Sequence, residues 1–197
     1  MEISAAQVKE LRDRTGAGMM ECKKALQEVG GDVEKAIDVL RARGAAKVAR
    51  RAGREAREGA VGSYIHMGGR IGVLIEINCE TDFVARNDEF QRLVKELAMH
   101  VAAANPLAVR AEEIPAELIE RERAVALVKV RNDGKPEHLR EKIVDGMMKK
   151  FFQENTLLEQ AFVVNPDMTV QQRVQEVAVA TSENIVVRRF VRYALGE

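Results

Sequence analysis

Apolar residues near the start of the chain recur at helical spacing until glycines interrupt them. Ser4 and Gln7 have the spacing of a capping box, and Val8 and Leu11 follow on one helical face. The glycines in Thr15–Gly18 permit a tight turn, so this helix is expected to end there.

Two more short helices are expected before the composition changes. Met19–Val29 carries apolar residues at the spacing of one buried face, and Gly30-Gly31 interrupts the pattern. Asp32 is a candidate N-cap for a third helix, which should end near Gly44. Three short helices can form a compact bundle, so residues 1–44 are predicted to be a small N-terminal domain.

A basic, alanine-rich stretch follows this bundle. From Arg41 to Glu58 the chain has seven Lys or Arg against two Glu. We interpret residues 45–58 as a solvated helical linker, because alanine favours a semi-rigid helix. The alternative is that Arg41 to Arg57 forms a basic strip for RNA or for an acidic partner surface.

After Gly59 the apolar positions alternate with a period of two, which predicts a β-hairpin. Val61 and Ile65 would form the apolar face of its first strand, and Met67–Arg70 would form the turn. The second strand would be Ile71–Cys79, with every other residue apolar.

The rest of the chain alternates between helical and strand-like patterns. A helix is expected from Asn87 to Asn105, a helical hairpin over residues 116–152, and a helix opened by the capping box of Thr169 and Gln172. The apolar stripes expected to pair inside the hairpin are Leu118, Val125 and Val128 on the first arm and Leu139, Ile143, Met147 and Phe151 on the second.

The last segment, Ile185–Tyr193, has strong β propensity. Strict alternation would place Ile185, Val187, Val191 and Tyr193 on one face, and Val186, Arg188, Phe190 and Arg192 on the other. Together these elements predict an α+β fold, in which a small helical domain precedes a core of antiparallel strands and helices over residues 59–197.

Composition narrows the function classes. Thirty-one basic and 31 acidic residues cancel, and aromatic residues make up only 4%, so we expect no direct nucleic-acid binding. Cys22 and Cys79 form no CxxC pair, which favours a reducing compartment, and the N-terminus lacks an apolar signal core. Without an apolar run of membrane-spanning length, we expect a cytoplasmic protein with no membrane contact.

Motifs for catalysis are absent from the sequence. It has no phosphate-binding loop, HExxH or GxSxG motif. Cys79, Glu80 and Asp82 are the remaining candidates for an enzyme or cation site, although two carboxylates are weak evidence for a cation. We therefore expect no catalytic residues, no cofactor and no bound metal, and we interpret His66, His100 and His138 as structural.

Phe83 is the most informative residue of the stretch NCETDFVARNDEF. It lies seven residues before Phe90 on an extrapolated helical stripe, which is typical of a core residue. However, Thr81 and Asn87 are both candidate helix caps, so Thr81–Arg86 could be a separate turn between strand and helix. Phe83 would then project at a corner and could bury about 150–250 Å² in a partner.

Three motifs in this order carry a family resemblance: TGAGMMECKKAL (Thr15–Leu26), NCETDFVARN (Asn78–Asn87) and ENIVVRRF (Glu183–Phe190). Together they resemble the elongation factor Ts family, the guanine-nucleotide exchange factors of elongation factor Tu, and the similarity runs along essentially the whole chain. The resemblance implies an N-terminal module similar to ubiquitin-associated domains and an antiparallel α+β core with a helical hairpin.

The resemblance also implies which residues meet the partner, elongation factor Tu in its GDP-bound and nucleotide-free forms. The segment Thr81, Asp82, Phe83 and Val84 would contact the G domain, with Phe83 as a wedge that dislodges the magnesium ion and Asp82 as its polar neighbour. Met19 and Met20 would dock the N-terminal module on the same domain, with Arg12 and Lys23 as weaker candidates. From the sequence alone, the methionines could equally belong to the small core.

One departure from longer relatives affects the assembly. Those relatives have two related core halves, whereas this chain has room for one, which would leave the strand Ile185–Tyr193 at an exposed sheet edge. The short members of the family imply a homodimer, in which a second subunit replaces the missing half.

Overall fold

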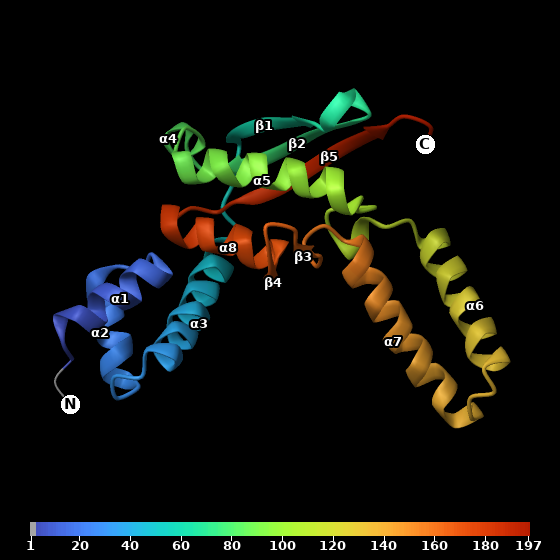
Figure 1. Cartoon of the computed structure of the whole chain (residues 1–197), viewed down its shortest axis with the longest axis horizontal. Helices are drawn as coiled ribbons and strands as arrows, with labels where there is room; N and C mark the ends of the chain where they lie inside the picture. Colours follow the sequence, from blue (N-terminus) through green and yellow to red (C-terminus); the bar gives the residue numbers. More distant parts are fainter. Residues whose placement is uncertain (1–2) are drawn as a thin grey trace.

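Three N-terminal helices form a bundle with its own core in the computed structural model, which describes residues 3–197 (Figure 1). They are α1 (Ala5–Thr15), α2 (Met19–Glu28) and α3 (Val33–Arg51). The capping box at the start of α1 is confirmed, because the Ser4 hydroxyl accepts a hydrogen bond from the backbone N–H of Gln7. The buried residues of this bundle are Val8, Leu11, Cys22, Ala25, Leu26, Ala36 and Ile37.

Helix α3 does not end near Gly44, so that expectation was wrong. It continues to Arg51, and Gly44 is buried where α3 crosses α8 (Val170–Thr181). A Cβ at residue 44 would lie 3.0 Å from Cγ2 of Val179, which leaves little room for a side chain. Gly44 therefore permits a close helix contact and does not act as a helix stop.

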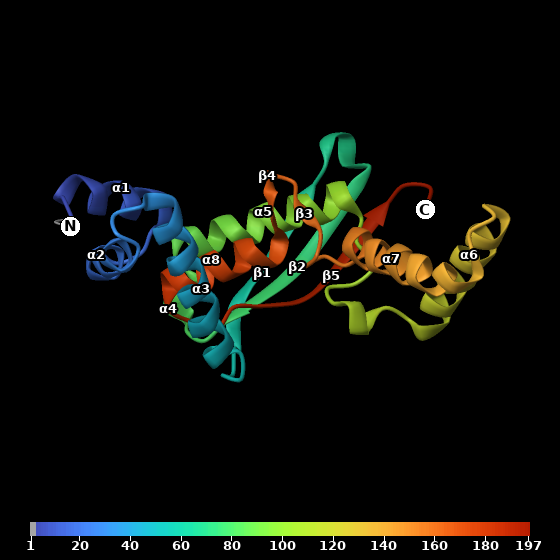
Figure 2. The ribbon, with the colours of Figure 1, turned by 90° about the horizontal axis from the view of Figure 1, so that it is seen from below.

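The central sheet has three antiparallel strands in the order β1-β2-β5. They are β1 (Glu58–Ile65), β2 (Ile71–Cys79) and β5 (Val186–Ala194). The hairpin of β1 and β2 was predicted, and a short 3₁₀ helix at Met67–Gly69 lies in its turn. Helix α5 (Asp88–Ala104) packs on one face of the sheet, with α8 and α3 stacked beyond it (Figures 1 and 2).

Strand β1 faces the opposite way from the prediction. Val61 and Ile65 lie on the outer face of the sheet and are mostly exposed, whereas Gly62 and Tyr64 face α5. The reason is Gly62: a Cβ there would lie 2.3 Å from Cγ1 of Val94, so the strand approaches α5 too closely for a valine.

A β-bulge changes the faces of β5. Glu76 pairs with Arg189 and Ile77 pairs with Val187, so Arg188 is an extra residue opposite β2. Val187 is therefore in the core, but Val191 and Tyr193 are exposed on the outer face. Strict alternation had predicted that all three residues lie on the same face. The fold class is confirmed as α+β with an antiparallel sheet, and within this sheet the side-chain faces of β1 and β5 were assigned wrongly.

A helical hairpin extends from the end of the core opposite α1 and α2 (Figures 1 and 2). The predicted helical hairpin consists of α6 (Ala116–Asn132) and α7 (Glu137–Asn155), preceded by a 3₁₀ turn at Ala111–Glu113. A small two-stranded sheet of β3 (Ala161–Phe162) and β4 (Asn165–Thr169), which the sequence did not predict, leads into α8.

The buried seam of the hairpin differs from the expected stripes. Val125 and Val128 are more than half exposed, and Leu139 is also exposed, whereas Ile143, Met147 and Phe151 only border the seam. The fully buried residues are Ala126, Val130, Val144 and Met148. The face of α6 that packs on α7 thus carries Ala126 and Val130, one helical turn apart, and is rotated from the predicted stripe of Val125 and Val128.

Among the helices of residues 3–197, none combines the length and apolar character that a bilayer crossing requires.

Candidate functional site

A sharp corner joins strand β2 to helix α5. Between them lies the one-turn helix α4 (Asp82–Ala85), and the Thr81 hydroxyl caps it by accepting the backbone N–H of Val84 at 3.3 Å. Asn87 caps α5 by accepting the N–H of Glu89 at 2.8 Å. Both predicted caps are therefore present, and Thr81–Arg86 is a separate turn.

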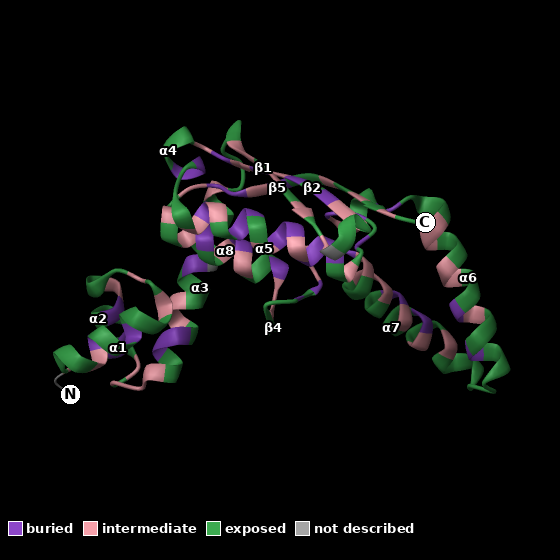
Figure 3. Ribbon diagram, turned by 45° about the horizontal axis from the view of Figure 1, so that its top comes forward, coloured by how far each residue is buried: buried purple, intermediate pink, exposed green. Residues whose placement is uncertain are grey.

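Phe83 projects from this corner into solvent. Its side chain is 78% exposed, whereas Val84, the next residue of α4, is buried in the central core. The interpretation of Phe83 as one more core residue was wrong, because the break at Asn87 ends the helical stripe that starts at Phe90. Figure 3 shows the outer side of α4 as exposed. An uncovered aromatic ring beside buried, anchored residues is suited to insertion into another protein.

The charged neighbours of Phe83 pair with each other. Asp82 accepts a hydrogen bond from the Arg86 guanidinium at 2.6 Å, one helical turn away, and both side chains are exposed. Within residues 3–197, no three His, Cys, Asp or Glu side chains are grouped as a metal ion would need. Asp82 lies in the first turn of α4, where a negative charge is favourable.

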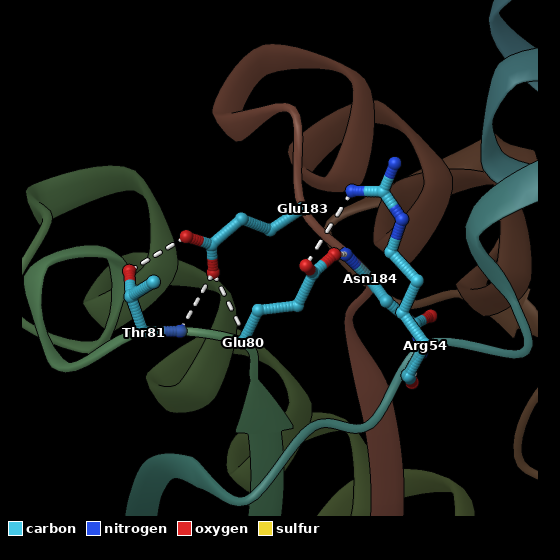
Figure 4. Close-up of polar contacts among 5 residues, drawn as sticks. All are labelled: Arg54, Glu80, Thr81, Glu183 and Asn184. Carbon is cyan, nitrogen blue, oxygen red and sulfur yellow. Dashed lines mark hydrogen bonds and ion pairs between the residues drawn. The ribbon is translucent and has the colours of Figure 1, made fainter.

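A carboxylate from the far end of the sequence binds the backbone of this corner (Figure 4). Glu183 accepts the backbone N–H groups of Glu80 and Thr81 through Oε2, at 3.0 and 3.1 Å. Its Oε1 accepts the hydroxyl of Thr81 at 2.6 Å. The sequence contained Glu183 in its third motif, but the 102 residues that separate it from Thr81 concealed the contact.

A second set of bonds runs in the opposite direction beside the first. The Glu80 carboxylate accepts the backbone N–H of Asn184 at 2.7 Å and pairs with Arg54 at 3.5 Å. The Asn184 side chain is buried and donates to the backbone carbonyl of Arg54 at 2.8 Å (Figure 4). The corner is therefore connected both to the start of β5 and to the segment that follows α3.

Cys79 lacks the character of a nucleophile. Its thiol is fully buried and donates to the Thr81 carbonyl at 3.2 Å. Burial, and secondly the charge of Glu183, raise the pKa of the Cys79 thiol to about 11. The thiol is thus protonated at neutral pH, which removes the basis for an enzyme built on Cys79, Glu80 and Asp82.

The histidine most deeply buried in the core is also a structural residue. His100 accepts the backbone N–H of Val163 through Nδ1 at 3.2 Å, and its Nε2 bonds to the side-chain oxygen of Gln160 at 2.9 Å. Burial lowers the pKa of His100 below its usual value, so the neutral ring predominates.

The N-terminal candidate residues are on the surface of the bundle. Met19 and Met20 begin α2 and are 51% and 66% exposed, so they do not form the small core. Arg12 and Lys23 are exposed as well. Helices α1, α2 and α4 lie toward the same end of the molecule, away from the α6–α7 hairpin (Figures 1 and 2).

Comparisons with known proteins agree along the whole chain. The family model described as "Elongation factor TS" matches residues 4–197. The chain is 59% identical over 197 residues to elongation factor Ts of Geobacter sulfurreducens, covering 100% of this chain and 91% of that protein. It is 55% identical over 196 residues to elongation factor Ts of Syntrophobacter fumaroxidans, covering 100% and 98% of the two chains.

Proposed function

The chain belongs to the elongation factor Ts family, and from this premise we propose that it is a guanine-nucleotide exchange factor for elongation factor Tu in the cytoplasm. It binds the GDP-bound GTPase, promotes GDP release and leaves the nucleotide-free form ready for GTP. It acts by binding and not as an enzyme, so it needs no nucleotide site of its own.

The observation that carries this proposal is the exposure of Phe83 on an anchored corner. Its ring is 78% exposed, while Val84 beside it is buried and the segment Glu80-Thr81 is held by three hydrogen bonds to Glu183. Two of these bonds involve Thr81 itself and the third involves the amide of Glu80. We propose that the segment Thr81–Val84 inserts near the magnesium and phosphate site of the GTPase, with Phe83 as the wedge that dislodges the ion.

The N-terminal bundle supplies a second contact in this proposal. Met19 and Met20 are adjacent, exposed apolar residues at the start of α2, and their flexible thioethers can adapt to a partner surface. Lys23 follows Met19 by one helical turn and adds a positive charge, and Arg12 lies at the end of α1. We propose that this surface docks on the G domain while the corner acts on the nucleotide site.

The exchange step is a thermodynamic linkage. If the factor weakens GDP binding by a given ratio, GDP must weaken binding of the factor by the same ratio. Exchange therefore proceeds through a ternary complex from which either ligand can leave. A contact by Phe83 made only in the nucleotide-releasing state would accelerate release without tightening the initial encounter.

We also propose a homodimer that covers the outer face of the sheet. On the described chain, α5 covers one face, and the other bears exposed apolar side chains from all three strands. These outer-face residues are Val61, Ile65, Leu74, Val191 and Tyr193. A second copy of the same surface would bury them by two-fold symmetry. The proposed domain division (1–44, 45–58 and 59–197) leaves this face within the core domain.

RNA binding through Arg41–Arg57 is less well supported. Four of its seven basic side chains are engaged by carboxylates: Arg43 with Glu28, Lys47 with Glu21, Arg54 with Glu80, and Arg57 with Glu55. These pairs reduce the charge that the strip offers to phosphates.

Stopped-flow release of labelled GDP from the cognate GTPase tests the proposed function. The protein should accelerate release in a saturable way, and added RNA should not compete. Spontaneous release that is unchanged at saturating protein would refute exchange activity. Affinity for RNA that falls steeply with salt would support the RNA alternative instead.

A further inference from the structure

We propose that Glu183 is a positioning residue for exchange: its carboxylate holds the Thr81–Val84 segment so that Phe83 points at the GTPase. The inference rests on the proposed function and deepens it, because Glu183 acts on the partner only through Thr81 and the backbone beside it.

The backbone at the corner needs such a partner. The ladders of β1 and β5 with β2 end at Cys79 and Asn78, so the N–H groups of Glu80 and Thr81 lie beyond the last sheet pairs. One carboxylate oxygen of Glu183 accepts both, at 3.0 and 3.1 Å. Hydrogen bonds to an ionised acceptor are stronger than neutral ones, so this contact fixes the chain direction where the strand ends.

Glu183 also orients the cap of the helix that carries Phe83. The Thr81 hydroxyl has one proton, and it donates this proton to Glu183 at 2.6 Å. Its lone pairs are then directed to the N–H of Val84, which is 3.3 Å away. Because α4 has only four residues, it is too short to be stable alone and depends on this cap.

Glu183 itself is held in place from the other side. Asn184, the next residue, is buried and donates its backbone N–H to Glu80 and its side-chain amide to the carbonyl of Arg54. Glu183 therefore accepts the backbone N–H groups of Glu80 and Thr81, and Glu80 accepts the backbone N–H of Asn184, the residue after Glu183 (Figure 4). This reciprocal arrangement places the side chain of Glu183 at the base of the corner without making it part of the exposed tip.

The test uses the full-length protein with the substitution Glu183→Ala. At saturating protein, the GDP release rate should fall about 5–10-fold, whereas the half-saturating concentration should change less than about twofold. Glu183→Gln keeps one acceptor oxygen for the two amides but loses the charge and the acceptor for the Thr81 hydroxyl, so the release rate should fall less than in Glu183→Ala. If the alanine variant does not fold, the glutamine variant provides the test.

A matched control is Glu113→Ala. Glu113 likewise accepts two backbone amides, those of Val109 and Arg110 at 3.1 and 3.4 Å, in the loop before α6. Its removal should cost comparable stability and leave the release rate unchanged. A wild-type release rate for Glu183→Ala, or an equal loss for Glu113→Ala, would overturn the proposal.

A double substitution separates positioning from general loss of structure. If Glu183 acts only by presenting Phe83, Glu183→Ala should cost little more in a Phe83→Ala background. The same fractional loss in both backgrounds would contradict the proposal. Hydrogen exchange gives a readout without the GTPase: the amides of Glu80 and Thr81 should lose protection in Glu183→Ala and keep it in Glu113→Ala.

These outcomes distinguish the two hypotheses. If wild-type protein fails to accelerate GDP release, the proposed function fails. If wild-type protein accelerates release, Phe83→Ala impairs it and Glu183→Ala does not, only the positioning role fails.

Discussion

Gly62 lies against Val94, and a Cβ at Gly62 would be only 2.3 Å from Cγ1 of that valine. The contact brings β1 onto α5 and turns Val61 and Ile65 outward. We expect Gly62→Ala to lower the free energy of unfolding by about 1–3 kcal/mol, because either the strand or the helix must move.

Urea denaturation measures this effect, and Gly53→Ala is the matched control, because a Cβ at Gly53 would meet no atom within 4 Å. The control should stay within about 0.5 kcal/mol of wild type. Adding Val94→Ala to Gly62→Ala should restore part of the loss. Equal stability of the two glycine variants would show that β1 and α5 are less closely packed than the contact of Gly62 with Val94 implies.

Phe83→Ala should slow GDP release at saturating protein by roughly 10–100-fold, because burial of the ring in the partner contributes about 1.5–3 kcal/mol. The variant should fold normally, since the ring is 78% exposed. Stopped-flow fluorescence of labelled GDP measures the rate. Leu107→Ala, which truncates another exposed apolar side chain, should release GDP as wild type does. An unchanged rate in Phe83→Ala would remove the ring from the mechanism.

The double substitution Met19→Ala and Met20→Ala should change the half-saturating concentration and not the maximal release rate. Loss of two exposed thioethers should raise the half-saturating concentration about 5–10-fold and leave the maximal release rate almost unchanged. The same titration measures both quantities. Leu139→Ala, on the distant hairpin, is the control. A lower maximal rate with unchanged half-saturation would assign these methionines to the release step and not to docking.

Leu74→Lys should dissociate the proposed dimer. Leu74 is half exposed at the centre of the outer face, between Ser63 of β1 and Val191 of β5. A buried, unpaired ammonium group at a two-fold interface is repeated in both subunits and strongly disfavours association. Analytical ultracentrifugation at micromolar concentration should show dimer for wild type and for Leu139→Lys, and monomer for Leu74→Lys. A monomeric wild-type protein would exclude this interface.

Protonation of His100 should lower the stability of the fold in mild acid. Burial lowers its pKa in the folded state below the reference value of 6.5. The unfolded chain therefore binds the proton more readily, so stability is full above about pH 6.5 and falls as the pH decreases below it. Urea denaturation at pH 7.5 and pH 5 should show a smaller loss for His100→Gln than for wild type. His138→Gln, at an exposed position, should retain the wild-type loss; an equal loss in both variants would contradict this role.

Local signals in the sequence predicted most helices correctly. The caps at Ser4, Asn87 and Thr169 each accept a backbone N–H of the helix that they begin. A cap is a contact over three residues or fewer, so its residues are close in sequence as well as in space. The same local signals separated Thr81 from α5 and so identified the corner of Phe83.

The errors arose where contacts distant in sequence override the local pattern. Alternation predicts two faces of a strand but not which face meets a helix, and Gly62 reversed the choice for β1. The extra residue Arg188 then shifted the alternation within β5. In the hairpin, the buried face of α6 carries Ala126 and Val130, and apolar spacing alone did not distinguish it from the face of Val125 and Val128. The link between Glu183 and Thr81 spans 102 residues, beyond any local pattern.

Because α3 is one uninterrupted helix of 19 residues, it works as a spacer with a defined rotation as well as a defined length. At about 1.5 Å per residue it spans about 28 Å, and each residue also turns the chain by about 100°. Gly44 fixes this spacer against Val179 of α8. An insertion of one residue before Gly44 would thus swing Met19 and Met20 to another side of the molecule while hardly altering their distance from the core. Variation in the length of α3 is therefore tolerable only in steps close to whole helical turns.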